Sequence, residues 1–139
     1  MNIKATIYSE RLDESKRVTQ TDKLFGIYFP MLLEPSIFSM AGKLSNDYTG
    51  GYWHFYALSN GGFYLAPEIP ETLSVKSENG YACEMTADAL GITACLYAYS
   101  HLSFTDLGKF SETCARQYHL LRECVFEHQE AKLILKVID

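Results

Sequence analysis

The sequence has no long apolar run. None of its apolar stretches approaches the roughly 20 residues that a helix needs to cross a bilayer. The first residues, MNIKATIYSERLDESKR, contain neither an apolar core nor a small-residue cleavage site, so they do not resemble a signal peptide. We therefore expect a cytoplasmic protein without a membrane segment, in which four cysteines are reduced thiols: Cys83, Cys95, Cys114 and Cys124.

Clusters of basic residues are also missing. The net charge is -5, from 17 acidic and 12 basic residues. The closest basic pair, Lys16-Arg17, lies next to Asp13 and Glu14. Proteins held on nucleic acid by phosphate contacts need clustered Lys and Arg, so we expect no direct nucleic-acid binding.

Motifs of catalysis and phosphate binding are absent as well. The chain has no G-x-S-x-G elbow, no G-x-G-x-x-G and no Walker lysine. We interpret the pairs Gly50-Gly51 and Gly61-Gly62 as turn glycines. His54, between Tyr52 and Tyr56 on one predicted strand face, makes the most site-like trio, and a half-buried strand face explains these residues as well. We expect the protein not to be an enzyme.

A set of cysteine and histidine residues resembles a metal site only at first sight. Cys114, His119, Cys124 and His128 fall in one predicted helical region. At about 100° per residue, Cys114 and His119 lie about 140° apart around a helix. A structural zinc site needs four convergent ligands, and only Cys124 and His128 share a helix face. We expect no metal and no cofactor.

Aromatic residues and glycine are abundant between Asn46 and Pro67, in NDYTGGYWHFYALSNGGFYLAP. The apolar period becomes two here, which predicts a strand over 52–58 and a second over 63–66. Asn60-Gly61-Gly62 is a typical tight turn between them, and Asn79-Gly80 predicts another between strands at 72–77 and 81–85. Together they form a four-stranded antiparallel meander over about 51–86. The sequence leaves open whether Glu84 faces water or a partner in the fold.

Helical patterns precede and follow this meander. Thr21-Asp22 is a possible N-cap for 23–29, and Pro35 can begin a helix that ends near Leu44. After the meander, Thr86 caps a helix over 87–101 that is apolar nearly all round, and Thr105 caps an amphipathic one. The final AKLILKVID is a helix or an edge strand. The sequence predicts one α+β domain over 1–139 with helices mainly on one face of the sheet and a loosely held lead-in at 1–20.

The aromatic stretch resembles the signature of the ArdB/KlcA antirestriction family. The shared features are YxGGYWxFYxLSNGGFYxAP and, upstream, Phe25-Gly26, the Met-Leu-x-Glu-Pro run at 31–35 and the Ala41 to Leu44 helix. The resemblance covers most of the chain, and its specific part is residues 25–67. It implies an α+β fold with an antiparallel sheet, no known cofactor or catalytic residue, and relief of host type I restriction of DNA from plasmids, prophages and other mobile elements.

Within this resemblance, the stretch has two expected roles. We expect a structural role for seven motif residues: Gly50, Gly51, Trp53, Phe55, Asn60, Gly61 and Gly62. We expect Tyr52, His54 and Tyr56 to form the other face of the strand, where exposed aromatic rings are suited to binding a partner. The partner would be a type I restriction enzyme or a factor that controls it. The sequence does not give the oligomeric state, and a monomer is compatible with it.

Three routes to antirestriction stay open at the level of sequence. Direct binding to a protein partner through the aromatic face fits the composition best. DNA mimicry by carboxylates needs a far more acidic chain, because duplex DNA carries about one charge per 1.7 Å. Enzymatic modification of the nuclease or its DNA is the third route, for which the sequence offers no recognisable residues.

Overall fold

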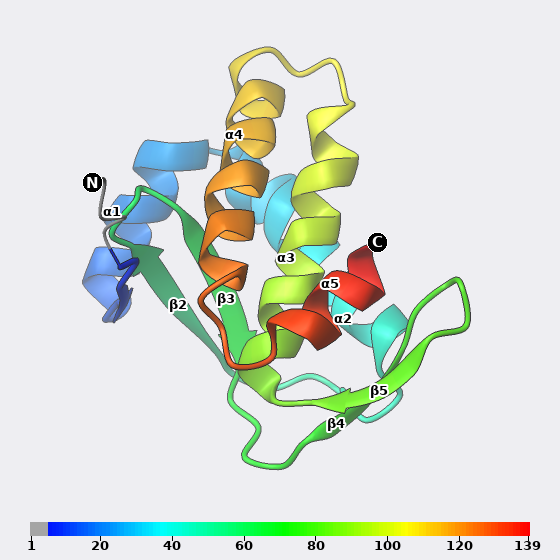
Figure 1. The fold of residues 1–139 in the computed structure, drawn as a ribbon. Coiled ribbons are helices and arrows are strands. Elements are labelled where there is room, and N and C mark those ends of the chain that lie inside the picture. Colours follow the sequence, from blue (N-terminus) through cyan, green and yellow to red (C-terminus); the bar gives the residue numbers. More distant parts are fainter. Residues whose placement is uncertain (1–5) are drawn as a thin grey trace, which may run out of the picture.

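The computed structural model of the chain describes residues 6–139, and residues 1–5 lie outside the described part (Figure 1). The elements follow one another as β1 (Ser9–Arg11), α1 (Glu14–Phe25), a π-helical turn η1 (Phe29–Leu33), α2 (Glu34–Leu44), β2 (Trp53–Leu58), β3 (Phe63–Pro67), β4 (Leu73–Lys76), β5 (Ala82–Met85), α3 (Ala87–Ser103), α4 (Lys109–Val125) and α5 (Ala131–Ile138). The α+β class is confirmed, and the four predicted strands are present at the expected positions.

The prediction of a single four-stranded meander is wrong in one respect: the four strands divide between two sheets. One sheet has the order β1-β2-β3, and the other is the hairpin β4-β5. The chain leaves the first sheet at Pro67-Glu68-Ile69-Pro70, where the two prolines supply no N–H for a ladder. The strand missing from the prediction is β1, which falls in the supposed loose lead-in.

Helix α3 closes the outer edge of β3, where β4 was expected. The Tyr99 hydroxyl donates to the Phe63 carbonyl at 2.7 Å. The Cys95 thiol accepts from the Leu65 N–H at 3.4 Å and donates to the Leu65 carbonyl at 3.7 Å. Buried main-chain groups at an unpaired edge need such partners. These bonds therefore replace the ladder that a fourth strand would have formed.

The close approach of α3 to β3 depends on Gly91. A Cβ placed on this residue would lie 2.3 Å from the Leu65 carbonyl oxygen and 2.5 Å from the Ala66 Cα. Such distances are far below van der Waals contact, so only glycine lets the helix reach the strand. The helix is buried on almost every side, as its apolar composition predicts, and Thr86 caps it through the Ala89 N–H at 3.3 Å.

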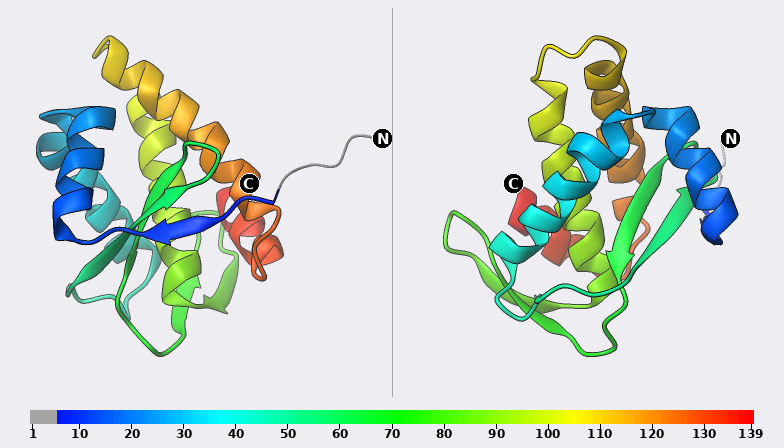
Figure 2. Two further views of the ribbon diagram at one scale, coloured as in Figure 1. Left: turned by 90° about the vertical axis from the view of Figure 1, so that its left-hand side faces the viewer. Right: turned by 180° about the vertical axis from the view of Figure 1, so that it is seen from behind.

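One face of the three-stranded sheet is covered by the N-terminal helices, as predicted (Figure 2, right). The pairs in contact are Phe25 with Phe63 at 5.8 Å between ring centroids, Phe29 with Phe55 at 5.7 Å, and Phe38 with Trp53 at 5.0 Å. Trp53 and Phe55 are thus buried under these helices, and the Trp53 indole donates to the Tyr48 hydroxyl at 3.0 Å.

The predicted lead-in at 1–20 is wrong for the described residues 6–20, which contain β1 and most of α1. Asp13 caps α1 by accepting from the Lys16 N–H at 2.8 Å. The cap expected at Thr21-Asp22 is inside this helix, where the Thr21 hydroxyl donates back to the Arg17 carbonyl. A Ser, Thr or Asp followed by a helical pattern is a frequent motif, so this local signal does not by itself fix the residue at which a helix begins.

The C-terminal half contains one further correction. Thr105 does not cap α4, which begins at Lys109 after Gly108, and its hydroxyl donates to the Leu102 carbonyl at the end of α3. The last segment is the helix α5, held on α3 by a bond from the Tyr97 hydroxyl to the Val137 carbonyl at 2.6 Å. Within residues 6–139 no single helix is long and apolar enough to cross a membrane; α1 with η1–α2 meets that test only as a pair bent by 93°.

The substitution Gly91→Ala tests the contact between α3 and β3. We expect it to lower the free energy of unfolding by about 1–3 kcal/mol or more, because the added methyl must displace main-chain atoms. Urea unfolding followed by circular dichroism measures the change. Gly42→Ala in the exposed part of α2 is the matched control, and it should stabilise the protein by about 0.5–1 kcal/mol, since nothing lies within 4 Å of its Cβ. Equal stability of Gly91→Ala and the parent protein would contradict the close contact.

Candidate functional site

A row of aromatic side chains crosses the sheet on the face opposite to Trp53 and Phe55. The row, called the aromatic row below, consists of Tyr52, His54, Tyr56 and Tyr64. Adjacent ring centroids are 5.3, 6.5 and 4.8 Å apart, and Tyr56 stacks on Tyr64 at an interplanar angle of 16°. Tyr52 is 48% exposed, His54 and Tyr56 are half-buried, and Tyr64 is buried. The predicted common face of Tyr52, His54 and Tyr56 is therefore present.

Each member of the aromatic row binds a charged side chain from another segment. The four contacts are Arg17 to the Tyr52 hydroxyl (2.7 Å), His54 to Glu68 (3.3 Å), Arg11 to the Tyr56 hydroxyl (3.1 Å) and the Tyr64 hydroxyl to Asp88 (2.7 Å). The charges alternate in sign along the row. Sequence reasoning missed all four charged partners, because they come from α1, the β3–β4 loop, β1 and α3.

Arg17 holds the exposed end of the row in place. Its guanidinium lies over the Phe55 ring at 4.4 Å and over the Tyr52 ring at 5.2 Å. It also donates to the Trp53 carbonyl at 3.4 Å, on the edge of β2 that β1 is too short to cover. A planar guanidinium can stack and donate at the same time, which a lysine cannot do. Tyr52 is thereby fixed although half of its surface is in water.

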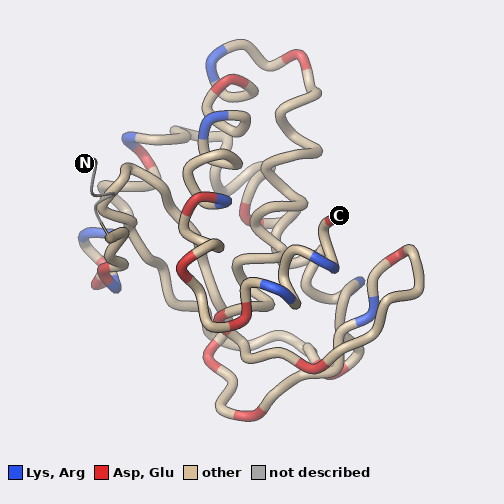
Figure 3. Tube along the Cα trace, in the orientation of Figure 1, with Lys and Arg blue, Asp and Glu red and all other residues tan. Residues whose placement is uncertain are grey.

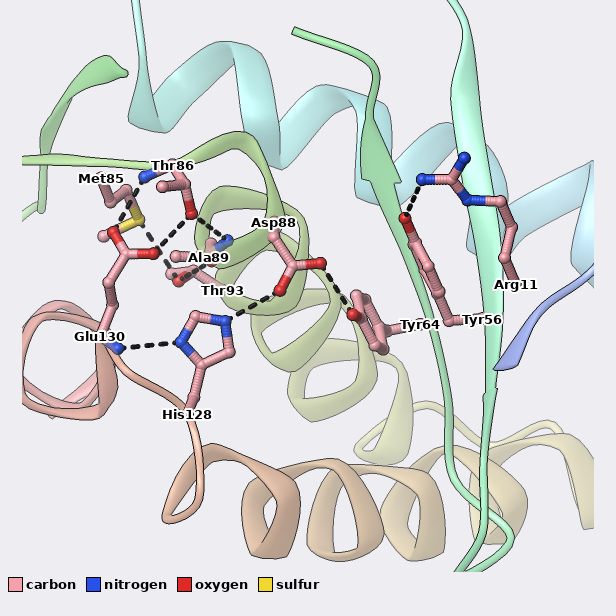
Figure 4. Close-up of polar contacts among 10 residues, drawn as sticks. All are labelled: Arg11, Tyr56, Tyr64, Met85, Thr86, Asp88, Ala89, Thr93, His128 and Glu130. Atoms are coloured by element: carbon pink, nitrogen blue, oxygen red, sulfur yellow. Dashed lines mark hydrogen bonds and ion pairs between the residues drawn. The ribbon is translucent and has the colours of Figure 1, made fainter. Parts of the chain in front are cut away.

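At its buried end the row continues into a polar network that ends on the α4–α5 turn (Figure 4). Asp88 accepts from Tyr64 and contacts the His128 Nε2 at 2.8 Å. The Glu130 N–H donates to the His128 Nδ1 at 2.9 Å, and the Glu130 carboxylate accepts from the Thr86 N–H at 2.9 Å and from its hydroxyl. The network connects the cap of α3 to the aromatic row.

Asp88 and His128 resemble a catalytic dyad, but their bonding is different. A main-chain N–H can only donate, so the His128 Nδ1 must accept from Glu130 and the proton must be on Nε2. That proton points to Asp88. Both ring nitrogens are therefore occupied within the chain, and the imidazole has none left to take a proton from a substrate. In this geometry the pair is structural.

The pKa of Asp88 reflects competing effects. Burial alone raises it, but the hydrogen bonds from His128 and Tyr64 outweigh burial, and the net effect is a pKa below the ordinary 3.8. Asp88 also lies in the first turn of α3, where a negative charge is favourable. The carboxylate is thus stabilised as an anion.

Two clefts are lined by residues discussed above. One, of about 620 Å³, lies beside the aromatic row and is lined by Arg11, His54, Tyr56, Glu68 and Asp88 among others. The other, of about 730 Å³, lies between the end of α2 and the β4–β5 hairpin. Glu84 lines this second cleft and is exposed on the hairpin, opposite Ser74.

The cysteine and histidine set does not converge. Cys114 is buried in the core, His119 is exposed, and His128 binds Asp88 and not Cys124. Across residues 6–139, no group of three or more His, Cys, Asp or Glu side chains is arranged to hold a metal ion. Burial raises the pKa of the Cys114 thiol to about 12 and that of Cys124 to about 11, so these thiols stay protonated at neutral pH.

The motif glycines and Asn60 lie in turns. The Asn60 side chain accepts from the Gly62 N–H at 2.9 Å and donates to the Leu120 carbonyl at 2.9 Å, which ties the β2–β3 turn to α4. Gly61 has φ +95°, a conformation that other residues rarely adopt. Gly50 and Gly51 also have positive φ, in the loop that leads to Tyr52.

Comparison with known proteins gives a consistent result. The family model for antirestriction proteins matches residues 46–139. The Escherichia coli antirestriction protein KlcA is 38% identical over all of this chain and 98% of its own length, and YafX, an uncharacterized protein of Escherichia coli K12, is 40% identical over 78% of this chain and 72% of its own. A solved chain from work on KlcA and ArdB superposes with a TM-score of 0.88 at 34% identity, over 100% of both chains. The KlcA and ArdB proteins are described there as having a novel fold and antirestriction activity against type I DNA restriction systems in vivo but not in vitro.

Asp88→Asn tests the network through pH. Because the folded-state pKa of Asp88 is below its ordinary value, its contribution to stability is present above about pH 4 and is lost as pH falls through the folded-state pKa. We expect Asp88→Asn to be less stable than the parent by about 1 kcal/mol at pH 7, a low value for a charged hydrogen bond because the side chain is partly exposed. The difference should shrink as pH falls below about 4.

Urea unfolding at a series of pH values measures this difference. Asp106→Asn is the control, since Asp106 is an exposed loop residue with no side-chain hydrogen bond among the described residues. A stability difference for Asp88→Asn that stays constant down to pH 3 would show that its carboxylate is not held as an anion by the network.

Proposed function

The chain belongs to the antirestriction protein family, and on that premise we propose that it relieves the host's type I restriction of incoming DNA from mobile elements. The observation that carries this proposal is the agreement with a KlcA/ArdB chain over the full length of both, at a TM-score of 0.88. Agreement over 100% of both chains means that this protein contains the elements of that relative from end to end, and not a shared fragment.

We propose that the protein acts by binding a protein partner through the aromatic row. Tyrosine buries a large surface with few rotatable bonds, which is why it is frequent at the centre of interfaces. In this chain the row is also held in place by charged side chains, so little conformational freedom is left to lose on binding. Tyr52 and Tyr56 are the residues we assign to the contact, with His54 between them.

The distribution of charge counts against DNA mimicry. Lys and Arg are interspersed with Asp and Glu over the described chain, and basic residues of α4 and α5 lie close to the acidic residues of the α4–α5 turn (Figure 3). A net charge of -5 is also small beside duplex DNA, which carries about one charge per 1.7 Å. A surface of this kind is better suited to a protein partner of mixed polarity.

The behaviour of the relatives favours a partner other than the purified nuclease. The KlcA and ArdB proteins act in vivo but not in vitro. A protein that blocks the DNA site of the enzyme needs nothing but the enzyme, and would inhibit in vitro as well. For this chain we therefore favour a cellular factor that controls the type I enzyme, reached by stoichiometric binding and without catalysis. Both ring nitrogens of His128 are engaged in hydrogen bonds within the chain, which supports a role without catalysis.

Plating efficiency tests the proposed function. Unmodified phage are plated on bacteria that carry a type I restriction system, with and without expression of this chain. We expect expression to raise the plaque count strongly, and Tyr52→Ala and Tyr56→Ala to reduce that gain about tenfold or more, as truncation of a central interface residue does. Phe104→Ala is the control, because Phe104 is 88% exposed and lies at the C-terminal end of α3, whereas Asp88 contacts the aromatic row from the N-terminal end.

Two outcomes are decisive for this experiment. If expression of the folded protein leaves the plaque count unchanged, the proposed function is wrong for that restriction system. If both tyrosine variants stay folded and keep full activity while the parent is active, the antirestriction function stands and the aromatic row is not the contact.

A further inference from the structure

Among the described residues 6–139, strand β1 forms a free edge of the three-stranded sheet. Within that range it pairs with β2 alone, with Ser9 opposite Leu58 and Arg11 opposite Tyr56. All three of its residues are exposed. In Figure 2 (left) β1 crosses the front of the view, at the surface of the molecule. A strand edge of this kind offers unpaired main-chain groups to another chain.

The hydrogen bonds define which groups are free. The Leu12 N–H donates to the Phe55 carbonyl and the Ser59 N–H donates to the Tyr8 carbonyl, both at 2.8 Å. Because main-chain groups alternate along a strand, Tyr8, Glu10 and Leu12 point to β2. Ser9 and Arg11 therefore point away from it. No hydrogen bond from residues 6–139 reaches the N–H or C=O of these two residues.

The side chain of Arg11 adds charge to this edge. One of its nitrogens donates to the Tyr56 hydroxyl at 3.1 Å, and its guanidinium lies 5.7 Å from the centre of that ring. No carboxylate of the described residues lies within 4 Å of it: Glu68 is turned to His54 at 3.3 Å. Its other N–H groups make no hydrogen bond within the part of the chain that the structure describes. Arg11 is exposed, so it is a positioned guanidinium whose free N–H groups can bind a partner's acceptor in place of water, and an Arg pairs best with a carboxylate.

The tyrosines next to it present donors as well. The Tyr52 and Tyr56 hydroxyls each accept a bond from an arginine, so the hydrogen of each hydroxyl remains to be donated. These two hydroxyls and the Arg11 guanidinium therefore offer donors to a partner that supplies acceptors. The edge itself alternates N–H and C=O, which matches another extended polypeptide and does not match a phosphate backbone.

We propose that β1 accepts an extended segment of a protein partner as an additional strand, with an Asp or Glu of that segment opposite Arg11. This inference rests on the proposed function, since it specifies the chemistry of the partner that the aromatic row contacts. Main-chain bonds to Ser9 and Arg11 hold the segment, and the ion pair with Arg11 sets its register and selects an acidic residue. The neighbouring tyrosine hydroxyls donate to the same segment.

The test uses blocked pentapeptides and the full chain. The probe is acetyl-Val-Thr-Glu-Thr-Val-amide, its counterpart has Lys in place of Glu, and a short oligo-dT strand represents nucleic acid. Amide hydrogen exchange is followed by NMR at millimolar peptide. We expect the Glu peptide to slow exchange of the Ser9 and Arg11 N–H groups and to leave that of Glu10 unchanged. It should bind about threefold to tenfold more tightly than the Lys peptide, as an opposite-charge pair across strands does.

Substitutions in β1 separate the contribution of the main-chain hydrogen bonds from that of the Arg11 ion pair. Ser9→Pro removes an N–H that no described residue uses, so the urea midpoint should stay unchanged while protection by the Glu peptide is lost. Ser9→Thr keeps the N–H and is the matched control. Arg11→Gln keeps the main chain and removes the charge, so the two peptides should then bind equally. Should Ser9→Pro fail to fold, Arg11→Gln alone still decides the matter.

Three results would overturn the proposal: no protection of Ser9 and Arg11 by the Glu peptide, equal binding of the Lys peptide by the parent protein, or binding of oligo-dT in place of the peptides. The plating assay distinguishes a failure of this strand-addition proposal from a failure of the proposed antirestriction function. If the tyrosine variants lose activity and the peptide gives no protection, only the proposal that β1 binds a partner strand is rejected. If the peptide gives protection and the parent protein shows no antirestriction, only the proposed function is rejected.

Discussion

The main chain of α3 and the main chain of β3 approach each other at Gly91, and the rest of the architecture depends on that contact. Without a Cβ at this position the helix comes close enough for Cys95 and Tyr99 to bond the outward groups of Leu65 and Phe63. The edge of β3 is then closed by side chains and not by a fourth strand. This is why the hairpin β4–β5 forms a separate sheet and why β1 joins the first sheet on its other side.

The position of the candidate site follows from this closure. The helix α3 covers one edge of the sheet, and α1, η1 and α2 cover one face. The other face, which carries Tyr56 with Tyr52 beside it, and the edge of β1 are therefore left towards water. Charged side chains from other segments contact the rings of the aromatic row on this face. Each of them, Arg11 and Arg17 among them, satisfies part of its hydrogen bonding on an aromatic partner. A surface with rigid tyrosines and fixed charges is the physical form that a selective protein contact takes.

Local patterns in the sequence were sufficient for several elements. The Asn60-Gly61-Gly62 turn follows from residues that accept positive φ, and the helix after Thr86 follows from its cap and its apolar composition. The α+β class and the resemblance to antirestriction proteins also came from local signals, and both are confirmed. The caps at Thr21 and Thr105 were wrong because a hydroxyl can bond inside or after a helix as well as before it, and only the three-dimensional neighbours decide which.

By itself the sequence determined which side chains share a face: the period of two over residues 52–58 put Trp53 and Phe55 on one side and Tyr52, His54 and Tyr56 on the other, because pleating fixes that alternation within one strand. Only the tertiary structure decided what each face meets. Arg11 and Arg17 are 45 and 35 residues away from the tyrosines they bind. Asp88 and His128 are 40 residues apart. Contacts over such separations arise from the packing of whole elements, which leaves no local pattern in the chain, and so the polar half of the candidate site became visible only in the fold.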